Sequence, residues 1–360
     1  MHITSLATSL PPYTLHQSQA KEFAQQMFGA SYPNIDRLLP IYDNAAIEQR
    51  NFCVPLEWFG ERHSFREKND LYIANAIELS ERAIGECLAK RGIGHDAVDY
   101  LLFVSTTGLA TPSIDARLIT SLPFRPDVKR LPIWGLGCAG GVAGLSRARE
   151  IVAADPTARV LVVVVELCGL TFMADDLSKA NLIASALFSD GCAVVLVEGE
   201  EAAGSSGGFR LLGSATRTMP DSLDVMGWDI SEEGFGIVIS RDIPTIVRTF
   251  MRESIDVLLG EHGLAASDIR YLIAHPGGAK VLEAYQESLE RPRSDFRHTW
   301  GALRDHGNMS AASVLFVLER FMEDIERDRK GLADGERLYG LMGALGPGFS
   351  SELMVVGIEN

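Results

Sequence analysis

The second half of the 360-residue chain repeats the pattern of its first half at a nearly constant spacing. Segment 92–101, a glycine followed by an apolar stretch, matches segment 263–272 so that Tyr100 lies opposite Tyr271. Farther along, segment 137–140 around Cys138 lies opposite segment 307–310 around Asn308. Because three matches in order at one spacing are improbable by chance, we infer a duplicated fold.

Each half combines apolar runs of strand length with amphipathic stretches of helix length, which indicates an α/β fold. Glycine follows both predicted long helices at a C-cap position, Gly92 and Gly263. The halves are expected at 1–205 and 206–360, packed face to face, with the Ser/Gly-rich stretch 204–208 as the seam. Buried strands are predicted at 100–105, 159–165, 192–197, 271–274, 337–344 and 353–358, and the helices at 70–91 and 245–262.

Composition excludes several classes of protein. Forty-eight acidic against 33 basic residues give a net charge of −15, which disfavours nucleic acid and anionic membranes as partners. The longest apolar run, 160–165, is far shorter than the roughly 20 residues of a membrane span. The N-terminus lacks the basic and apolar regions of a signal peptide, and the five cysteines include no CxxC. We therefore expect a cytoplasmic protein with reduced thiols, and no zinc site.

Cys138 stands in a glycine-rich stretch, WGLGCAGG, directly before a predicted helix at 142–153. The N-terminus of a helix stabilises a thiolate, and neighbouring glycines allow close approach of a substrate. The sequence around Cys138 thus indicates that this residue is a nucleophile. The alternative interpretation is a buried structural cysteine in a tight turn. The same stretch also reads GxGxxG (Gly135, Gly137, Gly140), the dinucleotide fingerprint, with Glu166 after the next strand. That reading is weakened by the short apolar run ahead of it.

Two polar residues of the second half, like Cys138 in the first, lie next to a predicted strand or helix end. His275 follows the strand at 271–274 in a Pro-Gly loop, where α/β folds place site residues; a core histidine is the alternative. Asn308 opens a predicted helix at 311–325 and could simply be its N-cap, but the repeat places it opposite Cys138. We predict that Cys138, His275 and Asn308 converge.

These three residue types suit acyl transfer. A thiolate activated by an adjacent imidazolium accepts an acyl group, and histidine and asparagine can donate hydrogen bonds to a developing oxyanion. Such chemistry needs neither a carboxylate nor a metal, and the sequence offers neither obviously beside these residues.

Five stretches resemble the chalcone synthase family, the type III polyketide synthases of the thiolase-fold superfamily. They are WGLGCAGG around Cys138, ALFSDG around Phe188, IAHPGG around His275, HGNMSAAS around Asn308 and GALGPGFSSE at 343–352, in family order. The resemblance implies a thiolase-like fold, in which two duplicated α/β halves pack as a five-layer αβαβα core.

The resemblance also implies roles for individual residues. Cys138 would carry the starter and the growing chain, while His275 and Asn308 would promote decarboxylation of the malonyl group. Phe188 matches the gatekeeping aromatic between the CoA tunnel and the cavity. Further positions expected to shape or line the cavity are Thr106, Thr111, Cys168, Thr171, Trp228, Gly346, Pro347 and Gly348. The family implies a homodimer that uses free acyl-CoA and malonyl-CoA, with no metal or other cofactor.

The chain departs from the plant enzymes of this family. Arg50 is the one basic residue in stretch 44–50, where plant members carry a basic cluster for CoA phosphates. Ile237 replaces a second gatekeeping aromatic. Cys168 resembles a cavity cysteine of bacterial tetrahydroxynaphthalene synthases, but the companion position holds Thr106. These differences indicate a bacterial-type member, and small side chains at the cavity favour a long acyl starter.

The resulting hypothesis is iterative decarboxylative Claisen condensation of an acyl-CoA starter with malonyl-CoA, giving an alkylpyrone or alkylresorcinol. A competing hypothesis is a single condensation like that of ketoacyl-acyl carrier protein synthase III, which also uses Cys, His and Asn. Two weaker hypotheses are a non-catalytic binding protein that keeps the fold and an NAD-dependent enzyme.

Overall fold

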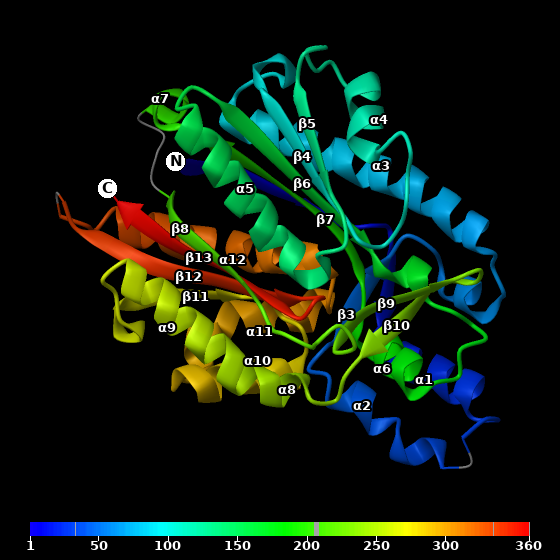
Figure 1. The fold of residues 1–360 in the computed structure, drawn as a ribbon. Coiled ribbons are helices and arrows are strands. Elements are labelled where there is room, and N and C mark those ends of the chain that lie inside the picture. The colour runs from blue at the N-terminus through cyan, green and yellow to red at the C-terminus, as the bar shows by residue number, and fades with distance from the viewer. Residues whose placement is uncertain (33, 205–208, 334, 360) are drawn as a thin grey trace.

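The computed structural model describes residues 1–32, 34–204, 209–333 and 335–359, and a mixed sheet of nine strands forms its centre (Figure 1). The strand order is β11-β12-β13-β8-β1-β7-β6-β4-β5. Two ribbons, β2–β3 and β9–β10, lie outside this sheet. The strands are β1 His2–Ser9, β2 Tyr13–His16, β3 Gln49–Phe52, β4 Tyr100–Val104, β5 Lys129–Ile133, β6 Arg159–Leu167, β7 Asp190–Glu198, β8 Phe209–Thr218, β9 Met226–Ser231, β10 Gly234–Ile239, β11 Ile269–Ala274, β12 Arg337–Gly346 and β13 Ser350–Glu359.

The sheet itself is duplicated, as the sequence repeat predicts. In the first half β6 is parallel to β4 and antiparallel to β7, which is antiparallel to β1. In the second half β12 is parallel to β11 and antiparallel to β13, which is antiparallel to β8. The halves join where β1 pairs with β8 at two positions, His2 with Arg210 and Ile3 with Phe209.

Helices complete the five predicted layers (Figure 1). Helices α5 and α12 lie between the two halves of the sheet, α3 covers the outer face of the first half, and α9 and α10 cover the outer face of the second. The α/β fold of two duplicated halves is therefore confirmed. The helices are α1 Gln17–Phe28, α2 Pro40–Asp43, α3 Phe65–Arg91, α4 Ile114–Ser121, α5 Gly140–Ala154, α6 Lys179–Leu187, α7 Glu200–Ala203, α8 Ile243–Ile246, α9 Arg252–Glu261, α10 Ala279–Leu289, α11 Arg297–His306 and α12 Ser313–Arg329.

Strand β6 shows why the predicted strands are apolar throughout. Val162 and Val164 face the central core between the half-sheets, whereas Leu161 and Val163 face the core under α3. A strand covered on both faces needs apolar residues at every position rather than at alternate ones.

The central helices begin close together. A Cβ atom on Gly141 of α5 would lie 2.3 Å from the carbonyl oxygen of Ala311, just ahead of α12. A glycine at this position therefore lets the two helix starts approach, and it brings the residues that precede them to one place.

The helix predictions are correct in position but differ in detail. The predicted helix at 70–91 begins earlier, at Phe65, because Ser64 caps it through the N–H of Glu67, and it ends at Gly92 with φ +74°. The predicted helix at 245–262 consists of α8, a π-helical turn (Val247–Met251) and α9. The proposed boundary at 205/206, and residues 205–208 of the seam, lie outside the described residues. No helix in the described ranges has the length and apolar character to cross a membrane.

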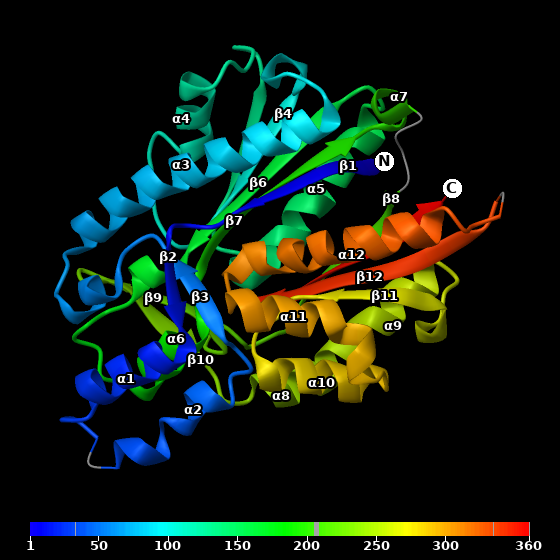
Figure 2. The same ribbon diagram turned by 180° about the vertical axis from the view of Figure 1, so that it is seen from behind.

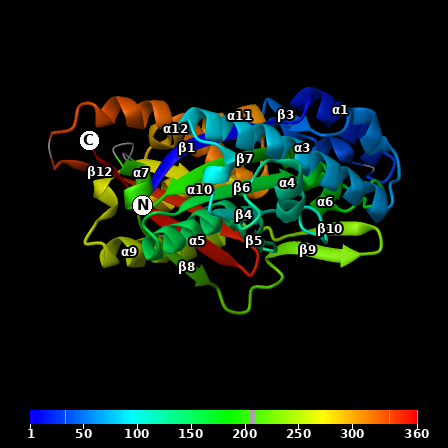
Figure 3. The same ribbon diagram turned by 90° about the horizontal axis from the view of Figure 1, so that it is seen from above.

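A smaller lobe adjoins one end of the layered core. It consists of α1, α2 and α6 with the ribbon β2–β3 (Figure 2), and the hairpin β9–β10 lies beside α6 (Figure 3). None of this lobe is predicted from the sequence.

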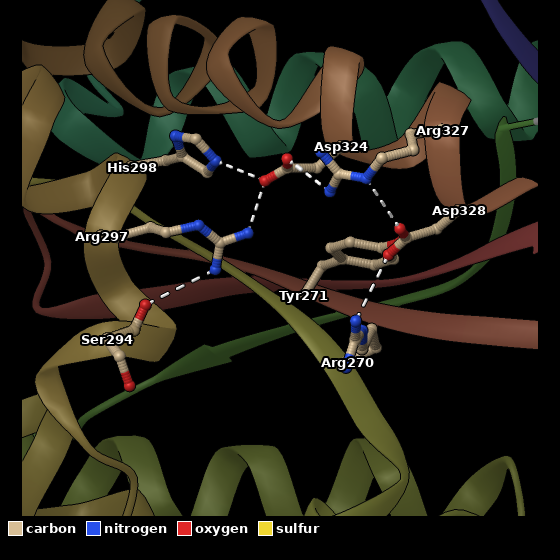
Figure 4. A network of polar contacts seen from close by, with 8 residues as sticks. All are labelled: Arg270, Tyr271, Ser294, Arg297, His298, Asp324, Arg327 and Asp328. Atoms are coloured by element: carbon tan, nitrogen blue, oxygen red, sulfur yellow. Dashed lines mark hydrogen bonds and ion pairs between the residues drawn. The ribbon is translucent and has the colours of Figure 1, made fainter.

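A polar network fastens α12 to its neighbours (Figure 4). Asp324 of α12 accepts hydrogen bonds from Arg297 and, at 2.6 Å, from His298, both at the start of α11. One turn later Asp328 accepts a bond of 2.7 Å from the hydroxyl of Tyr271 in β11. The network thereby ties a central helix to a strand and to an outer helix.

Candidate active site

Cys138 lies where the sequence predicts, at the start of a central helix. It occupies a 3-10 turn, Gly137–Ala139, that leads directly into α5, and it is 8% exposed. The side chains of Ser310 and Asn308 lie close enough to its thiol to lower the pKa of that thiol. The structure thus brings together the two residues that the repeat places opposite one another.

Asn308 is held by its backbone and its side chain together. Its N–H donates to Leu187 and its carbonyl accepts from Ser189, on either side of Phe188, at 2.9 Å each. Its Oδ1 accepts from the N–H of Ser310 at 2.9 Å, so it satisfies the first N–H of the 3-10 turn Ser310–Ala312, although Met309 and not Asn308 is the N-cap residue of that turn. Its Nδ2 donates to the carbonyl of Gly277 at 3.3 Å. Asn308 can therefore accept the hydrogen bond from Ser310 through Oδ1 and still present its Nδ2 group at the site.

His275 follows β11 as predicted, and its N–H donates to the carbonyl of Gly343 at 2.8 Å. It lies two residues before Gly277, the partner of Asn308. The side chain is buried, yet within the described residues neither ring nitrogen has a hydrogen-bond partner. Buried polar groups are normally paired, so an unpaired imidazole is available for a ligand.

Burial dominates the protonation of this site. It raises the pKa of Cys138 to about 12, although hydrogen bonds from Ser310 and Asn308 oppose the shift. It also lowers the pKa of His275 to about 3. The expected thiolate–imidazolium pair is therefore not the resting form of the enclosed site, because charge separation there is costly.

A carboxylate that the sequence does not reveal as part of this site lies beside it. Glu166, at the end of β6, accepts hydrogen bonds from the N–H of Thr106 (2.9 Å), the hydroxyl of Thr107 (3.0 Å) and the hydroxyl of Ser310 (3.2 Å). Burial raises its pKa to about 7. The sequence does not obviously offer this carboxylate beside the site, and the signal for it is a charged residue near the end of the apolar run at 159–167.

The Gly-Pro-Gly segment packs directly on the cysteine turn. Gly346 ends β12, and a Cβ atom there would lie 2.3 Å from the carbonyl oxygen of Leu136. Pro347 occupies the space beside Gly137, where an added Cβ would lie 2.6 Å from its ring. Gly137 and Gly140 of the GxGxxG pattern therefore serve close packing, whereas Gly135 has open space around it and a φ of +91°. The close packing of these two glycines argues against the dinucleotide reading.

Half of the predicted cavity residues, Arg50 among them, line one apolar pocket next to this site. Its wall includes Phe188, Cys168, Thr171, Trp228 and Ile237. Trp228 connects the pocket to the site, because its indole N–H donates to the carbonyl of Thr106 at 3.0 Å. The hydroxyl of Thr106 in turn accepts from the N–H of Gly137, beside Cys138, at 3.1 Å.

Thr106, Gly346, Pro347 and Gly348 do not line this pocket, and two further predicted residues differ from the expectation. Thr111 is exposed in the loop after β4 and lines none of the pockets beside the site. Arg50 borders the pocket but is 1% exposed, and its guanidinium donates to the carbonyls of Ser185 (2.7 Å) and Phe188 (2.8 Å). It holds the backbone at Phe188 and is not presented at the surface, where CoA phosphates would lie.

Comparison with known proteins agrees with this geometry. Family models of chalcone and stilbene synthases match the chain, the N-terminal domain over 55–201 and the C-terminal domain over 210–358. A chalcone synthase-like protein of Bacillus subtilis (strain 168) is 44% identical over 99% of this chain and 98% of its own. A 1,3,6,8-tetrahydroxynaphthalene synthase of Streptomyces peucetius subsp. caesius is 36% identical over 98% of this chain and 92% of its own.

Among solved structures, the tetrahydroxynaphthalene synthase of Streptomyces coelicolor A3(2) superposes with a TM-score of 0.92 at 27% identity, covering both chains completely. The fold, the ordered motifs and these matches lead to one assignment. The chain belongs to the chalcone and stilbene synthase family, the type III polyketide synthases.

Proposed function

We propose that the protein loads an acyl group from acyl-CoA onto Cys138 and extends it repeatedly with malonyl-CoA before the product cyclises. One observation carries this proposal: the thiol of Cys138 touches Asn308, whose amide bonds Gly277 beside the unpaired ring of His275. The nucleophile of one half thus lies beside the amide of the other half, and the imidazole lies two residues from the partner of that amide. CoA thioesters suffice as substrates, and we propose no metal or other cofactor.

In the loading step the sulfur of Cys138 attacks the carbonyl carbon of the acyl-CoA. His275 takes the thiol proton as the carbon–sulfur bond forms, and it returns that proton to CoA as the thiol leaves. Because both groups are neutral at rest, we expect this proton transfer to accompany arrival of the thioester.

In the extension step malonyl-CoA loses carbon dioxide, and the electron pair of the broken carbon–carbon bond becomes an enolate. The Nδ2 group of Asn308 and an N–H of His275 donate hydrogen bonds to the enolate oxygen. The enolate carbon then attacks the acyl-Cys138 carbonyl, which releases the sulfur and leaves a chain two carbons longer on CoA.

We propose a long aliphatic starter, with an alkylpyrone or alkylresorcinol as product. The pocket beside the site supports this choice, because phenylalanines and small apolar side chains dominate its wall. A single condensation on a carrier protein is not favoured, because both halves of the chain match chalcone and stilbene synthase models.

We also propose that the protein acts as a cytoplasmic homodimer through the face around β5. This strand ends the sheet, so one side of it has no partner strand in the described chain. Three large apolar side chains on or beside it are exposed, Leu109, Leu131 and Trp134, between 39% and 46%. An open edge with exposed apolar groups suits pairing with a second copy.

Trapping of the acyl-enzyme tests the assignment of Cys138. After brief incubation with acyl-CoA alone, mass spectrometry of the intact protein and its peptides should find one acyl group on the peptide of Cys138. Cys87→Ala, a substitution in the core under α3, should behave like the wild type. Cys138→Ala should carry none, though slow decarboxylation of malonyl-CoA can persist. Equal acylation of Cys138→Ala would end the proposal.

A further inference from the structure

The apolar pocket extends well beyond the residues expected of the cavity. It continues past Phe188 to the smaller lobe, where Ala20 and Phe23 of α1, Phe52 of β3 and Ala184 of α6 complete its wall. The open cavity is small, about 50 Å³, and only the whole space between these atoms, solvent at the mouth included, amounts to about 640 Å³, so a bound chain would have to displace side chains. An acyl chain that starts at Cys138 and passes Trp228 and Phe188 would therefore run toward α1.

A second hollow lies behind this pocket, on the surface of the lobe. Three residues line both spaces: Phe59, Phe172 and Met173. Phe59 is buried, whereas Phe172 and Met173 are partly exposed. These side chains thus separate the pocket from the surface groove.

This wall is made of side chains on turns and loops rather than of paired strands. Phe172 and Met173 belong to segment 172–178, between the 3-10 turn Cys168–Thr171 and α6. The rings of Phe59 and Phe172 meet edge to face, with centroids 5.8 Å apart. Since rotamer changes of partly exposed side chains occur within nanoseconds, this wall can open without unfolding any element.

The groove behind the wall differs from the pocket in charge. Its lining is acidic, with five carboxylates against two cationic side chains, Arg62 and Lys68. Arg62 is already paired with Asp175. A polar group at the end of an acyl chain would be solvated in this groove, whereas a carboxylate there would be repelled. The carboxylates are Glu61, Asp175, Asp176, Glu232 and Glu233.

We propose that Phe59, Phe172 and Met173 form a rear gate, through which the distal end of a long acyl starter leaves the pocket and enters the acidic groove. This inference rests on the proposed function and adds a substrate class to it. The enzyme should take aliphatic acyl-CoAs that are longer than the pocket, including chains with a terminal hydroxyl or ammonium group. A terminal carboxylate should be disfavoured.

Four 16-carbon acyl-CoAs test the gate in the wild-type protein: unsubstituted, ω-hydroxy, ω-amino and ω-carboxy. A closed pocket would bury the hydroxyl unpaired, which costs about tenfold or more in kcat/KM. The gate instead predicts that the hydroxy and amino chains lie within about threefold of the unsubstituted one. The carboxylate should lose about tenfold at low salt and recover part of this loss at high salt.

Substitutions of Phe172 provide a second test of the gate. Phe172→Trp should impair the 16-carbon substrates but not octanoyl-CoA, and Phe172→Ala should favour the longer chains. Leu177→Ala is the matched control, because Leu177 lies in the same segment and lines neither space. A tenfold penalty for the hydroxy chain in the wild type, or an unchanged substrate ranking in both Phe172 variants, would overturn the gate.

Binding to Cys138→Ala separates failure of the gate from failure of the proposed reaction. With this variant the gate predicts equal affinity for the unsubstituted and ω-hydroxy acyl-CoAs, whether or not condensation takes place. If no acyl-CoA of any length is extended by the wild type but these affinities are equal, the proposed reaction fails and the gate stands. Much weaker binding of the ω-hydroxy chain would contradict the gate alone.

Discussion

At Cys138 two effects act in opposite directions. The start of α5 and the hydrogen bonds from Ser310 and Asn308 favour the thiolate, whereas complete burial favours the thiol. Burial prevails in the free protein, where the pKa is raised to about 12. We therefore expect Cys138 to react slowly with general alkylating agents but readily with a thioester that fills the site.

Asn308 can be tested as an oxyanion donor separately from its role as a cap. Asn308→Ala should lower kcat by about 10²–10³, equivalent to about 2.7–4 kcal/mol of transition-state stabilisation. Loss of the cap to Ser310 should lower the free energy of unfolding by only about 1 kcal/mol. Steady-state kinetics and denaturant unfolding measure the two effects.

Asn308→Asp is the matched control, because it keeps the capping oxygen and lacks the Nδ2 donor. It should lose turnover like the alanine variant. Turnover within about threefold of the wild type in both variants would return Asn308 to capping alone.

Glu166 should control the reactivity of Cys138 in a pH-dependent manner. Burial raises the pKa of Glu166 to about 7, and its negative charge raises the pKa of Cys138. Above pH 7 the ionised carboxylate therefore suppresses the thiolate, and below pH 7 the protonated form does not. Glu166→Gln should accelerate alkylation of Cys138 by iodoacetamide severalfold at pH 8 and hardly at pH 6. An equal acceleration at both values would contradict this coupling.

At the scale of elements, the turn between β12 and β13 positions the cysteine turn. Gly346→Ala would force a Cβ against the carbonyl of Leu136, so we expect about 1–3 kcal/mol less stability and a large loss of acyl loading. Gly227→Ala in β9, where no atom lies within 4 Å of the added Cβ, is the control. Thermal unfolding measures the stability of the two variants, and acyl trapping measures their loading. Wild-type loading by Gly346→Ala would disprove the positioning role.

The network around Asp324 should make the anchoring of α12 sensitive to acid. Burial alone would raise the pKa of Asp324, but hydrogen bonds from His298, Arg327 and Arg297 outweigh it and hold that pKa well below its usual range. A depressed pKa stabilises the fold above the unfolded value of about 3.9, and this stabilisation is lost as the pH falls toward the folded value.

We therefore expect Asp324→Asn to reduce the free energy of unfolding by about 1–3 kcal/mol at pH 7 and by progressively less below about pH 4. Urea titrations at several pH values measure this difference. The control is Asp70→Asn, at an exposed position of α3. A difference that grows on acidification would refute the proposed anchoring.

At the scale of the whole molecule, the repeat predicts three of the four pairs of equivalent strands that relate the halves. The missing pair is β1 with β8. Apolar runs identify strands buried on both faces, but β1 mixes polar and apolar residues without a regular period, and its burial follows from long-range pairing with β7. The convergence of Cys138 with Asn308 follows from the repeat in the same way.

Glu166, the smaller lobe and the burial of Arg50 could not be predicted from the sequence, because they also depend on contacts between distant segments. Glu166 looks like the polar end of a strand, and only the folded chain brings it to Ser310, far away in sequence. The smaller lobe and its pocket are built from segments without repeat partners. Arg50 is an example of a residue whose position cannot be predicted from the sequence, because its burial against Phe188 depends on side-chain packing.

The proposed dimer can be tested at the open edge of the sheet. Leu131→Lys places a charge among the exposed apolar side chains beside β5, so the dimer should dissociate to monomers. Val257→Lys, at an exposed position of α9, should leave the dimer intact. Light scattering coupled to size exclusion gives the masses. A monomeric wild type, or equal dissociation of both variants, would rule out this interface.

Iterative condensation on free CoA thioesters distinguishes the proposed reaction from a single condensation on a carrier protein. The most direct measurement is mass spectrometry of the products that purified protein forms from malonyl-CoA and acyl-CoAs of two to sixteen carbons, with no carrier protein added. We predict pyrones or resorcinols that retain the starter chain, most abundant with the long starters. A product of one condensation, formed only after acyl carrier protein is added, would contradict the account.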